Sequence, residues 1–363
     1  MPSTRVIYQQ ENVFVGPPNS TGFFYSSGNS GANLVKQLFR VQSANRSFNI
    51  SRQDINELGQ LARIDAVITE PPTVALELSW YSTNLNNESG IGLSVNGPFS
   101  CISGILTKAN DDRNIFVSRS PQGQDDNTYA ANGNGRICYG LGNCFLSNYS
   151  IEGSVGGLAT ASASFEGFNF FSYGAASGVS PAILPFNGTS VVGPTFQLPV
   201  GVSGIFGQAS AIRFGEMVVD ISNVNVIGAA VSDLKIQSFN LNLPVARESI
   251  SVLGSLYPSS KEVTVPVNAS LTVETIIGDS ATGNLSQVLC NDGNYTITVS
   301  LYKPACPGIT GQLAARYTLV GAKLDSQDFS MGIGPAETLS LPFSVQLGGA
   351  NSTVGVFISG AID

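Results

Sequence analysis

The side chains that most often do chemistry in proteins are scarce in this chain. It contains no histidine, the residue most used for proton transfer near neutral pH and for binding transition metals. Histidine-dependent triads, zincin sites and most zinc centres are therefore excluded. The cysteines are odd in number and form no Cys-x-x-Cys pair, which favours reduced cytoplasmic thiols over a disulfide framework. There are five of them: Cys101, Cys138, Cys144, Cys290 and Cys306.

Acidic and glycine-rich turns add little chemistry. Asp125-Asp126-Asn127 and Asp292-x-Asn294 lack the further ligands and the distal glutamate of a calcium loop, so we interpret them as solvated turns. Motifs for phosphate binding, for a nucleophilic serine and for dinucleotides are absent, and Gly133-x-Gly135 lies in a polar loop. No spacing of carboxylates marks a pair that could hydrolyse glycosides. We predict no enzyme, no cofactor, and no catalytic, cofactor-binding, metal or nucleic-acid-binding residues.

The composition narrows the class of protein further. The 363 residues include 17 Lys and Arg against 25 Asp and Glu, a formal charge of −8 with a pI near 4.6, which argues against a DNA-coating protein. Hydrophobic residues make up 42%, too many for a disordered chain, whereas only 12% are charged. The chain shows neither a secretory signal nor ~18 consecutive apolar residues, so we expect neither secretion nor a membrane span.

Apolar and polar residues alternate along much of the chain. Residues 74–80, 159–165 and 296–301 have this period of two, which is typical of antiparallel strands with one buried face. Turn residues separate the alternating segments, and we predict a hairpin over 149–171 with Gly156-Gly157 at the bend. The predicted fold class is all-β, a sandwich or barrel.

The chain also contains an internal repeat. Residues 41–81 align without gaps with residues 236–276, which lie 195 positions later. They share 11 identities in 41 pairs, where chance gives about three. A second block agrees, since residues 149–165 parallel residues 329–343 once two residues are gapped.

The repeat predicts two tandem copies of one β-sandwich domain. We place them at residues 1–172 and 173–363, with 173–230 partly linker. A Pro- and Gly-rich bridge over 172–205 lies between the copies. Each copy is expected to add one short helix to its strands.

Helical signals are few. Ser51 and Asp54 precede apolar residues at i, i+3 and i+6 spacing, which predicts a short helix over 51–61 with a counterpart over 250–256. A further candidate helix lies at 98–108, and its counterpart lies at residues 283–289.

Aromatic residues are plentiful for a charge-poor chain, with 20 Phe and 11 Tyr. Clusters such as Phe23-Phe24-Tyr25 exceed what strand alternation needs. They fit either a hydrophobic core or a subunit interface, where aromatic residues are enriched. A surface poor in charge and rich in Ser and Asn is what a self-assembling shell or tube presents.

Two segments resemble a known family. Tyr149–Gly167 (YSIEGSVGGLATASASFEG) is similar to the long hairpin of the tail tube proteins of long-tailed bacteriophages, in which a Thr/Ser/Ala-rich strand follows a Gly turn and ends at Phe-x-Gly. Arg52-x-x-Ile55-x-x-Leu58-Gly59 and the strand from Pro71 to Leu76 resemble the front of that domain. The second copy departs from the pattern, with Gly334-Pro335 at the turn and Phe343-Ser344-Val345 after it.

The resemblance implies a subunit whose strands join those of its neighbours in a ring-shaped barrel. Six single domains ordinarily form the ring, so three two-domain chains would form it with pseudo-sixfold symmetry, and stacked rings would form the tube for DNA ejection. The long loop expected over 109–136 would bridge successive rings. The implied partners are the chain itself, tape measure, tail terminator and distal tail or baseplate proteins, and DNA passing without specific binding. The implied location is the virion tail, assembled in the host cytoplasm; the presence of a sheath stays open.

The net acidity predicts a role in such a tube. Three chains of −8 carry −24 per ring, and acids that face the lumen would repel DNA phosphates and let DNA slide. The sequence pattern does not determine which face of each strand points toward the lumen.

Two other classes remain. Another virion protein, such as a capsid, decoration or fibre module, shares the composition. A secreted carbohydrate-binding β-sandwich would fit the ten Asn-x-Ser/Thr sequons, although Trp80 is the only tryptophan available for stacking on sugar rings.

Overall fold

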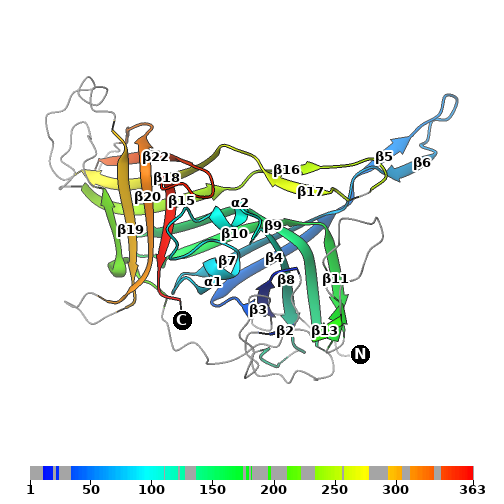
Figure 1. Ribbon diagram of the computed structural model, residues 1–363, viewed down its shortest axis with the longest axis horizontal. Helices are drawn as coiled ribbons and strands as arrows, with labels where there is room; N and C mark the ends of the chain where they lie inside the picture. Colours follow the sequence, from blue (N-terminus) through cyan, green and yellow to red (C-terminus); the bar gives the residue numbers. More distant parts are fainter. Residues whose placement is uncertain are drawn as a thin grey trace.

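The chain is folded mainly into antiparallel strands, which confirms the predicted all-β class. The structure is a computed structural model and is shown in Figure 1. It describes residues 11–18, 22–23, 34–109, 111–121, 123–126, 136–174, 177–179, 181, 195–197, 211–221, 234–255, 257–277, 293–304, 311–330 and 337–362.

Two groups of strands follow one another along the chain. The first group is β1 (Glu11–Gly16), β2 (Gly22–Phe23), β3 (Leu34–Gln37), β4 (Val41–Asn49), β5 (Arg52–Ile55), β6 (Asp65–Ile68), β7 (Thr73–Tyr81), β8 (Asp112–Arg119), β9 (Ile137–Ser154), β10 (Thr160–Gly167) and β11 (Asn169–Tyr173). Between the groups lie β12 (Ser177–Val179) and β13 (Thr195–Gln197). The second group is β14 (Met217–Ile221), β15 (Leu234–Pro244), β16 (Arg247–Ile250), β17 (Ser260–Val263), β18 (Val267–Ile277), β19 (Tyr295–Tyr302), β20 (Leu313–Leu324), β21 (Asp328–Ser330), β22 (Thr338–Leu347) and β23 (Gly355–Gly360). The helices among the described residues are α1 (Asn86–Gly90), α2 (Ser103–Leu106) and the 3₁₀ helix η2 (Phe214–Glu216).

One antiparallel sheet runs through both groups. Its strand order is β4-β7-β10-β9-β15-β18-β22-β21. The first half of the long β9 leaves this sheet and pairs with β8 and β11, next to β1 and β3. The strands β14-β19-β20-β23 form the corresponding layer of the second group. The predicted hairpin is confirmed, because β9 and β10 pair on either side of Gly156, whose φ is 83°.

The two groups repeat the same strand order and register. β4 pairs with β7 with a register shift between Val41 and Ser43. β15 pairs with β18 with the same shift between Ile236 and Ser238, 195 positions later. The pairs β8 and β19, β10 and β22, and β11 and β23 occupy corresponding places. The division of the chain at residue 172 stays a prediction.

The second repeated block corresponds at an offset of 178 residues. Phe165 lies opposite Leu76, and Phe343 lies opposite Leu271, the counterpart of Leu76. The pairing of β21 with β22 keeps the offset at which β9 pairs with β10. The two-residue gap introduced in the sequence alignment is therefore not needed.

The helices predicted over 51–61 and 250–256 are wrong. β5 pairs with β6, and β16 pairs with β17, so each segment belongs to a two-stranded arm. Leu58 and Leu61 are fully exposed, at 102% and 111%. A short helix is stabilised mainly by burying its apolar face, and these side chains have no surface to pack against.

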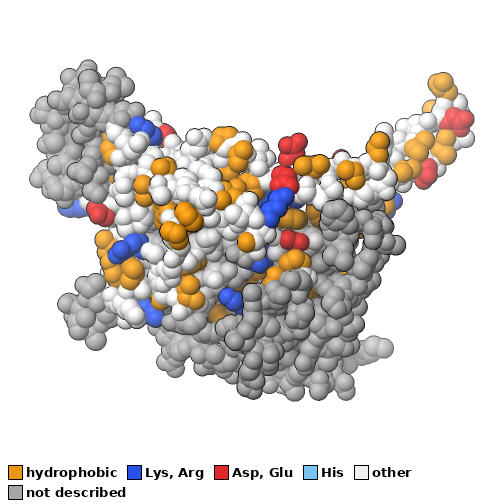
Figure 2. All heavy atoms as spheres, in the orientation of Figure 1, with side chains coloured by type: hydrophobic (Ala, Val, Ile, Leu, Met, Phe, Trp, Pro, Cys, Tyr) orange, Lys and Arg blue, Asp and Glu red, His pale blue; other side chains and the backbone are white. Residues whose placement is uncertain are grey.

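The arm formed by β5 and β6 projects from the body at the upper right of Figure 1. Figure 2 shows hydrophobic and acidic side chains along it, whereas charged side chains are sparse over much of the visible body. Gly59 and Gly254 occupy the same position in the two arms, with φ of 94° and 89°. This positive φ strains residues with a Cβ, so glycine suits both turns.

The other predictions of helices and loops have mixed outcomes. The candidate over 98–108 is confirmed in part by α2, whereas residues 283–289 lie outside the described residues. α1 was not predicted, and within the described residues the second group has η2 in place of an α-helix. The loop predicted over 109–136 is wrong for residues 112–119, which form β8, with its central residues 115–117 fully buried.

A buried carboxyl group links the two groups in the core. Glu88 Oε1 accepts hydrogen bonds from Trp80 Nε1 at 3.3 Å and from the Tyr149 hydroxyl at 3.2 Å. The Tyr149 hydroxyl lies 2.9 Å from that of Tyr317 in β20. Burial disfavours the charged carboxylate and raises the pKa of Glu88 to about 7. Burial also raises the pKa of Asp112 to about 7.

We predict that Glu88→Gln changes how stability depends on pH. Because the folded state raises the pKa of Glu88 from 4.5 to about 7, it binds the proton more tightly, and the wild type loses stability as pH rises through this window. Above pH 7 the variant should be more stable than wild type by up to about 3 kcal/mol. The difference should vanish below pH 4.5.

Urea unfolding at a series of pH values, followed by Trp80 fluorescence, measures this effect. Asp112 titrates in both proteins, so the variant should keep a shallower pH dependence rather than none. Glu77→Gln, which removes an exposed carboxyl group, is the matched control. Parallel stability profiles for wild type and Glu88→Gln would show that Glu88 does not titrate in this window.

Candidate functional site

The outward side of the eight-stranded sheet is a continuous polar surface, which we call the polar face. Along β7 the buried Val74, Leu76, Leu78 and Trp80 alternate with outward residues, and the other strands of the sheet alternate in the same way. The strand period of two places all outward residues on one side. The polar face includes Glu77, Ser79, Ser150, Glu152, Ser162, Asn240, Thr272, Glu274 and Ser340.

The charged groups at the centre of the polar face are all acidic. Glu77 lies opposite Asn45 and Ser164, Glu152 lies opposite Thr160 and Asn240, and Glu274 lies opposite Ser238 and Ser340. None of the ion pairs found among the described residues includes Glu77, Glu152 or Glu274. All three carboxylates are exposed to solvent. This surface therefore repels anions and offers hydroxyl and amide groups between its charges.

Hydrogen bonds between strands order the polar face. Ser150 and Ser162 join β9 to β10 through their hydroxyls at 2.8 Å. Ser238 in β15 donates a hydrogen bond to Glu274 in β18 at 2.8 Å. The side chains are thus tied to neighbouring strands in both groups.

The two groups meet at the pairing of β9 with β15, which we call the seam. It runs from Ser238 opposite Ser154 to Pro244 opposite Asn148. On the core side, Gly153 lies opposite Phe239, and a Cβ on Gly153 would lie 2.7 Å from the ring of Phe239. Glycine therefore lets this ring pack over the neighbouring strand.

A buried arginine ties the arm of the second group to the first group. Arg247 in β16 forms an ion pair with Asp111 at 2.6 Å, and their side chains are 1% and 9% exposed. Its Nε donates a hydrogen bond to the Leu146 carbonyl at 3.1 Å, and its guanidinium lies 5.0 Å from the Phe145 ring centre. The counterpart in the first arm, Arg52, is exposed. The same residue type thus has opposite environments in the two repeats.

We predict that Arg247→Met destabilises the protein by about 3 kcal/mol, because the substitution leaves a buried carboxylate without its charged partner. Arg52→Met is the matched control at the corresponding position, and it should cost less than about 0.5 kcal/mol, as is usual for exposed sites. Urea unfolding at neutral pH measures both changes. Equal losses of stability would contradict the difference in burial.

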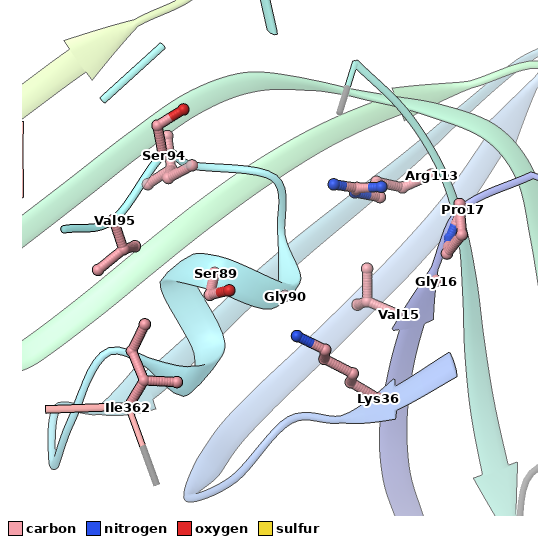
Figure 3. Close-up of a pocket in the computed structure, with 11 residues that line it drawn as sticks. Val15, Gly16, Pro17, Lys36, Ser89, Gly90, Ser94, Val95, Arg113 and Ile362 are labelled. Carbon is pink, nitrogen blue, oxygen red and sulfur yellow. The ribbon is translucent and has the colours of Figure 1, made fainter. Parts of the chain in front are cut away.

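A separate cavity of about 350 Å³ lies between α1, β1, β3 and β8. The side chains of Lys36 and Arg113 point into it, and Ser89, Ser94 and Ile362 lie at its wall (Figure 3). Burial lowers the pKa of both basic groups, and the charge of Arg113 further lowers that of Lys36. The described lining includes no carboxylate and no cysteine.

The candidate cysteines that the structure describes lie in the core. Cys101, Cys138 and Cys144 are free and buried, and burial raises the pKa of all three thiols. Residues 290 and 306 lie outside the described residues, as do Gly133-x-Gly135 and the acidic residue 292.

The interpretation of Asp126 as a solvated residue is wrong. It is 2% exposed, and its carboxylate accepts hydrogen bonds from Asn12 at 2.9 Å and from the Ser118 hydroxyl. The same carboxylate forms an ion pair with Arg136 at 3.2 Å. β1 and β8 bring these partners together. Among the described residues, no three Cys, Asp or Glu side chains are grouped so that they could hold a metal ion. In the same part of the chain, no helix has the length and apolarity needed to cross a membrane.

Comparisons with models of known protein families and with curated sequences found no match.

The polar face could not be assigned from the sequence. The sequence indicates this face only through the alternation of residues, with Ser, Thr, Asn and Glu between apolar residues in 74–80 and 149–165. Strand order was needed to show that the outward residues of both repeats share one surface.

Proposed function

We propose that the protein is a structural virion protein, a tail tube subunit that polymerises into stacked rings and forms the conduit for DNA ejection. In this proposal it has no enzymatic activity. One observation carries the proposal: two repeats of the same strand order are joined side by side in a single sheet. The resemblance of Tyr149–Gly167 to the hairpin of tail tube proteins supports it.

The seam is a head-to-tail contact, because β9 and β15 are not counterparts of each other. Contacts of this kind generate a closed ring when the rotation closes, or an open filament when it does not. Three chains would bring six repeats into a ring with pseudo-sixfold symmetry. Ring closure would also remove the open edges of the sheet, which otherwise favour aggregation.

The polar face is suited to the wall of a DNA conduit. Glu77, Glu152 and Glu274 would contribute nine carboxylates to a ring of three chains. Such a wall repels phosphates, so DNA passes without binding to it. We therefore assign the polar face to the lumen.

The proposed partners are other copies of the chain, the tape measure and tail terminator proteins, and distal tail or baseplate proteins. The proposed location is the virion tail, assembled in the host cytoplasm. Whether the tail has a sheath stays open in this proposal.

We predict that the concentrated recombinant protein forms hollow tubes with regular striations in negative-stain electron microscopy. Rotational averages of end views should show three chains and six similar lobes, because each chain contributes two repeats. Closed shells or trimeric spikes would contradict the tube and favour another virion protein. A secreted glycoprotein would instead carry glycans on its sequons, visible in the intact mass after native expression.

We also predict that a variant in which Glu77, Glu152 and Glu274 are all replaced by Lys slows DNA release from virions built with it. The wall would then attract phosphates. Tube assembly should be unchanged in electron micrographs. A dye that fluoresces on released DNA measures the rate. The control variant makes the same change in total charge by replacing three exposed acidic residues of the arms with Lys: Glu57, Asp65 and Glu248. Equal release rates for the two variants would argue against a luminal polar face.

A further inference from the structure

Among the strands that the structure describes, each chain has an unpaired copy of both halves of the seam. β9 and β15 form the seam, and their counterparts at offsets of 178 and 195 residues are β21 and β4. Among the described strands, β4 pairs with β7 and β21 pairs with β22, and no strand pairs with the other edge of either. Open edges of this kind readily add a further strand.

The core side of both open edges is exposed where the seam is buried. Three apolar residues at these edges have counterparts in the seam that are almost inaccessible to solvent. With the edge residue first, the pairs are Phe48 and Leu243 (65% and 1%), Ile50 and Val245 (37% and 0%), and Phe329 and Ile151 (47% and 0%). Both edges therefore present apolar surface, whereas the counterparts of these residues are covered in the seam.

We infer that β4 of one chain pairs with β21 of a second chain in the register of the seam. This inference deepens the proposed function and rests on it, because it takes the protein to work as an assembly of its own copies. Asn240 lies opposite Glu152 in the seam. Their counterparts are Asn45 and Ser330, which should therefore lie opposite each other across two chains.

The register used for this inference is repeated within the chain. Glu152 lies opposite Thr160 in the first group, and Ser330 lies opposite Thr338 in the second, with both pairs 178 positions apart. The occupant is a second copy of the chain because the two open edges are the two complementary halves of one known contact. Phe48 and Phe329 would then be covered as Leu243 and Ile151 are.

The arms agree with this arrangement. β16 and β17 follow β15 past the seam and contact the first group, where Lys261 binds Glu166 at 2.5 Å. β5 and β6 follow β4 in the same way but project into solvent (Figure 1). In the inferred contact, this arm extends over the second group of the neighbouring chain.

Cysteine cross-linking tests the register. The variant Asn45→Cys with Ser330→Cys should form disulfide-linked oligomers under mild oxidation, because directly opposite residues have Cβ atoms about 4.5–5.5 Å apart. A short bismaleimide links pairs whose geometry does not suit a disulfide. Non-reducing gels should show a ladder ending at a closed trimer, which reduction returns to single chains.

Three controls make the result specific. Asn45→Cys with Asp328→Cys moves one partner two residues along the same face and should link at least tenfold less, because diagonal pairs lie about 7–8 Å apart. Glu152→Cys with Asn240→Cys places the same geometry within one chain, and it should lose its free thiols without forming oligomers. The wild type reports any linking by its own five cysteines.

The outcomes separate this inference from the proposed function. Oligomers linked through residues 45 and 330 support the inferred contact, whether or not tubes form; linked rings without tubes contradict the tube alone. Tubes that do not link at 45 and 330, while the 152 and 240 pair does, overturn the contact and leave the tube standing. Equal or stronger linking at 45 and 328 overturns the register. A chain that stays monomeric and unlinked at high concentration contradicts both.

Discussion

The pairing of β9 with β15 is the contact on which the rest of the structure depends. It makes one sheet of two repeats, so that their polar residues share one side and their apolar residues share the other. Because the pairing joins different edges of the two repeats, one edge of each kind has no partner strand among the described residues. The fold thus combines a completed contact with the two halves of the same contact.

The distribution of charge follows from this arrangement. Carboxylates on the polar face stay in water, where they cost little desolvation energy and keep the surface anionic. Two buried ionisable groups are paired or hydrogen-bonded, namely Arg247 with Asp111 and Glu88 with Trp80 and Tyr149. Both of these buried groups link one repeat to the other, so polar contacts inside the protein reinforce the seam.

Local patterns predicted the strands well and the arms poorly. Alternation over 74–80, 159–165 and 296–301 predicted β7, β10 and β19, because one buried face imposes a period of two. The spacing of Ile55, Leu58 and Leu61 fits a helix as well as a turn between strands. Pairing with residues 65–68 decided it, and such pairing depends on a partner outside the local window. The acidic residues of the polar face were visible, but their common side required the strand order.

The sequence by itself determined the all-β class, the internal repeat and the bend of the long hairpin, because these depend on residue periodicity, identity and turn chemistry. Only the tertiary structure decided what each repeated residue does. Arg52 and Arg247 are the same residue at the same repeat position, yet one is exposed and the other is buried in an ion pair. Phe48 and Leu243 differ in the same way. The physical reason is that burial depends on what lies beside the strand. β15 has β9 of the first repeat along one edge, whereas no described strand pairs with the same edge of its counterpart β4.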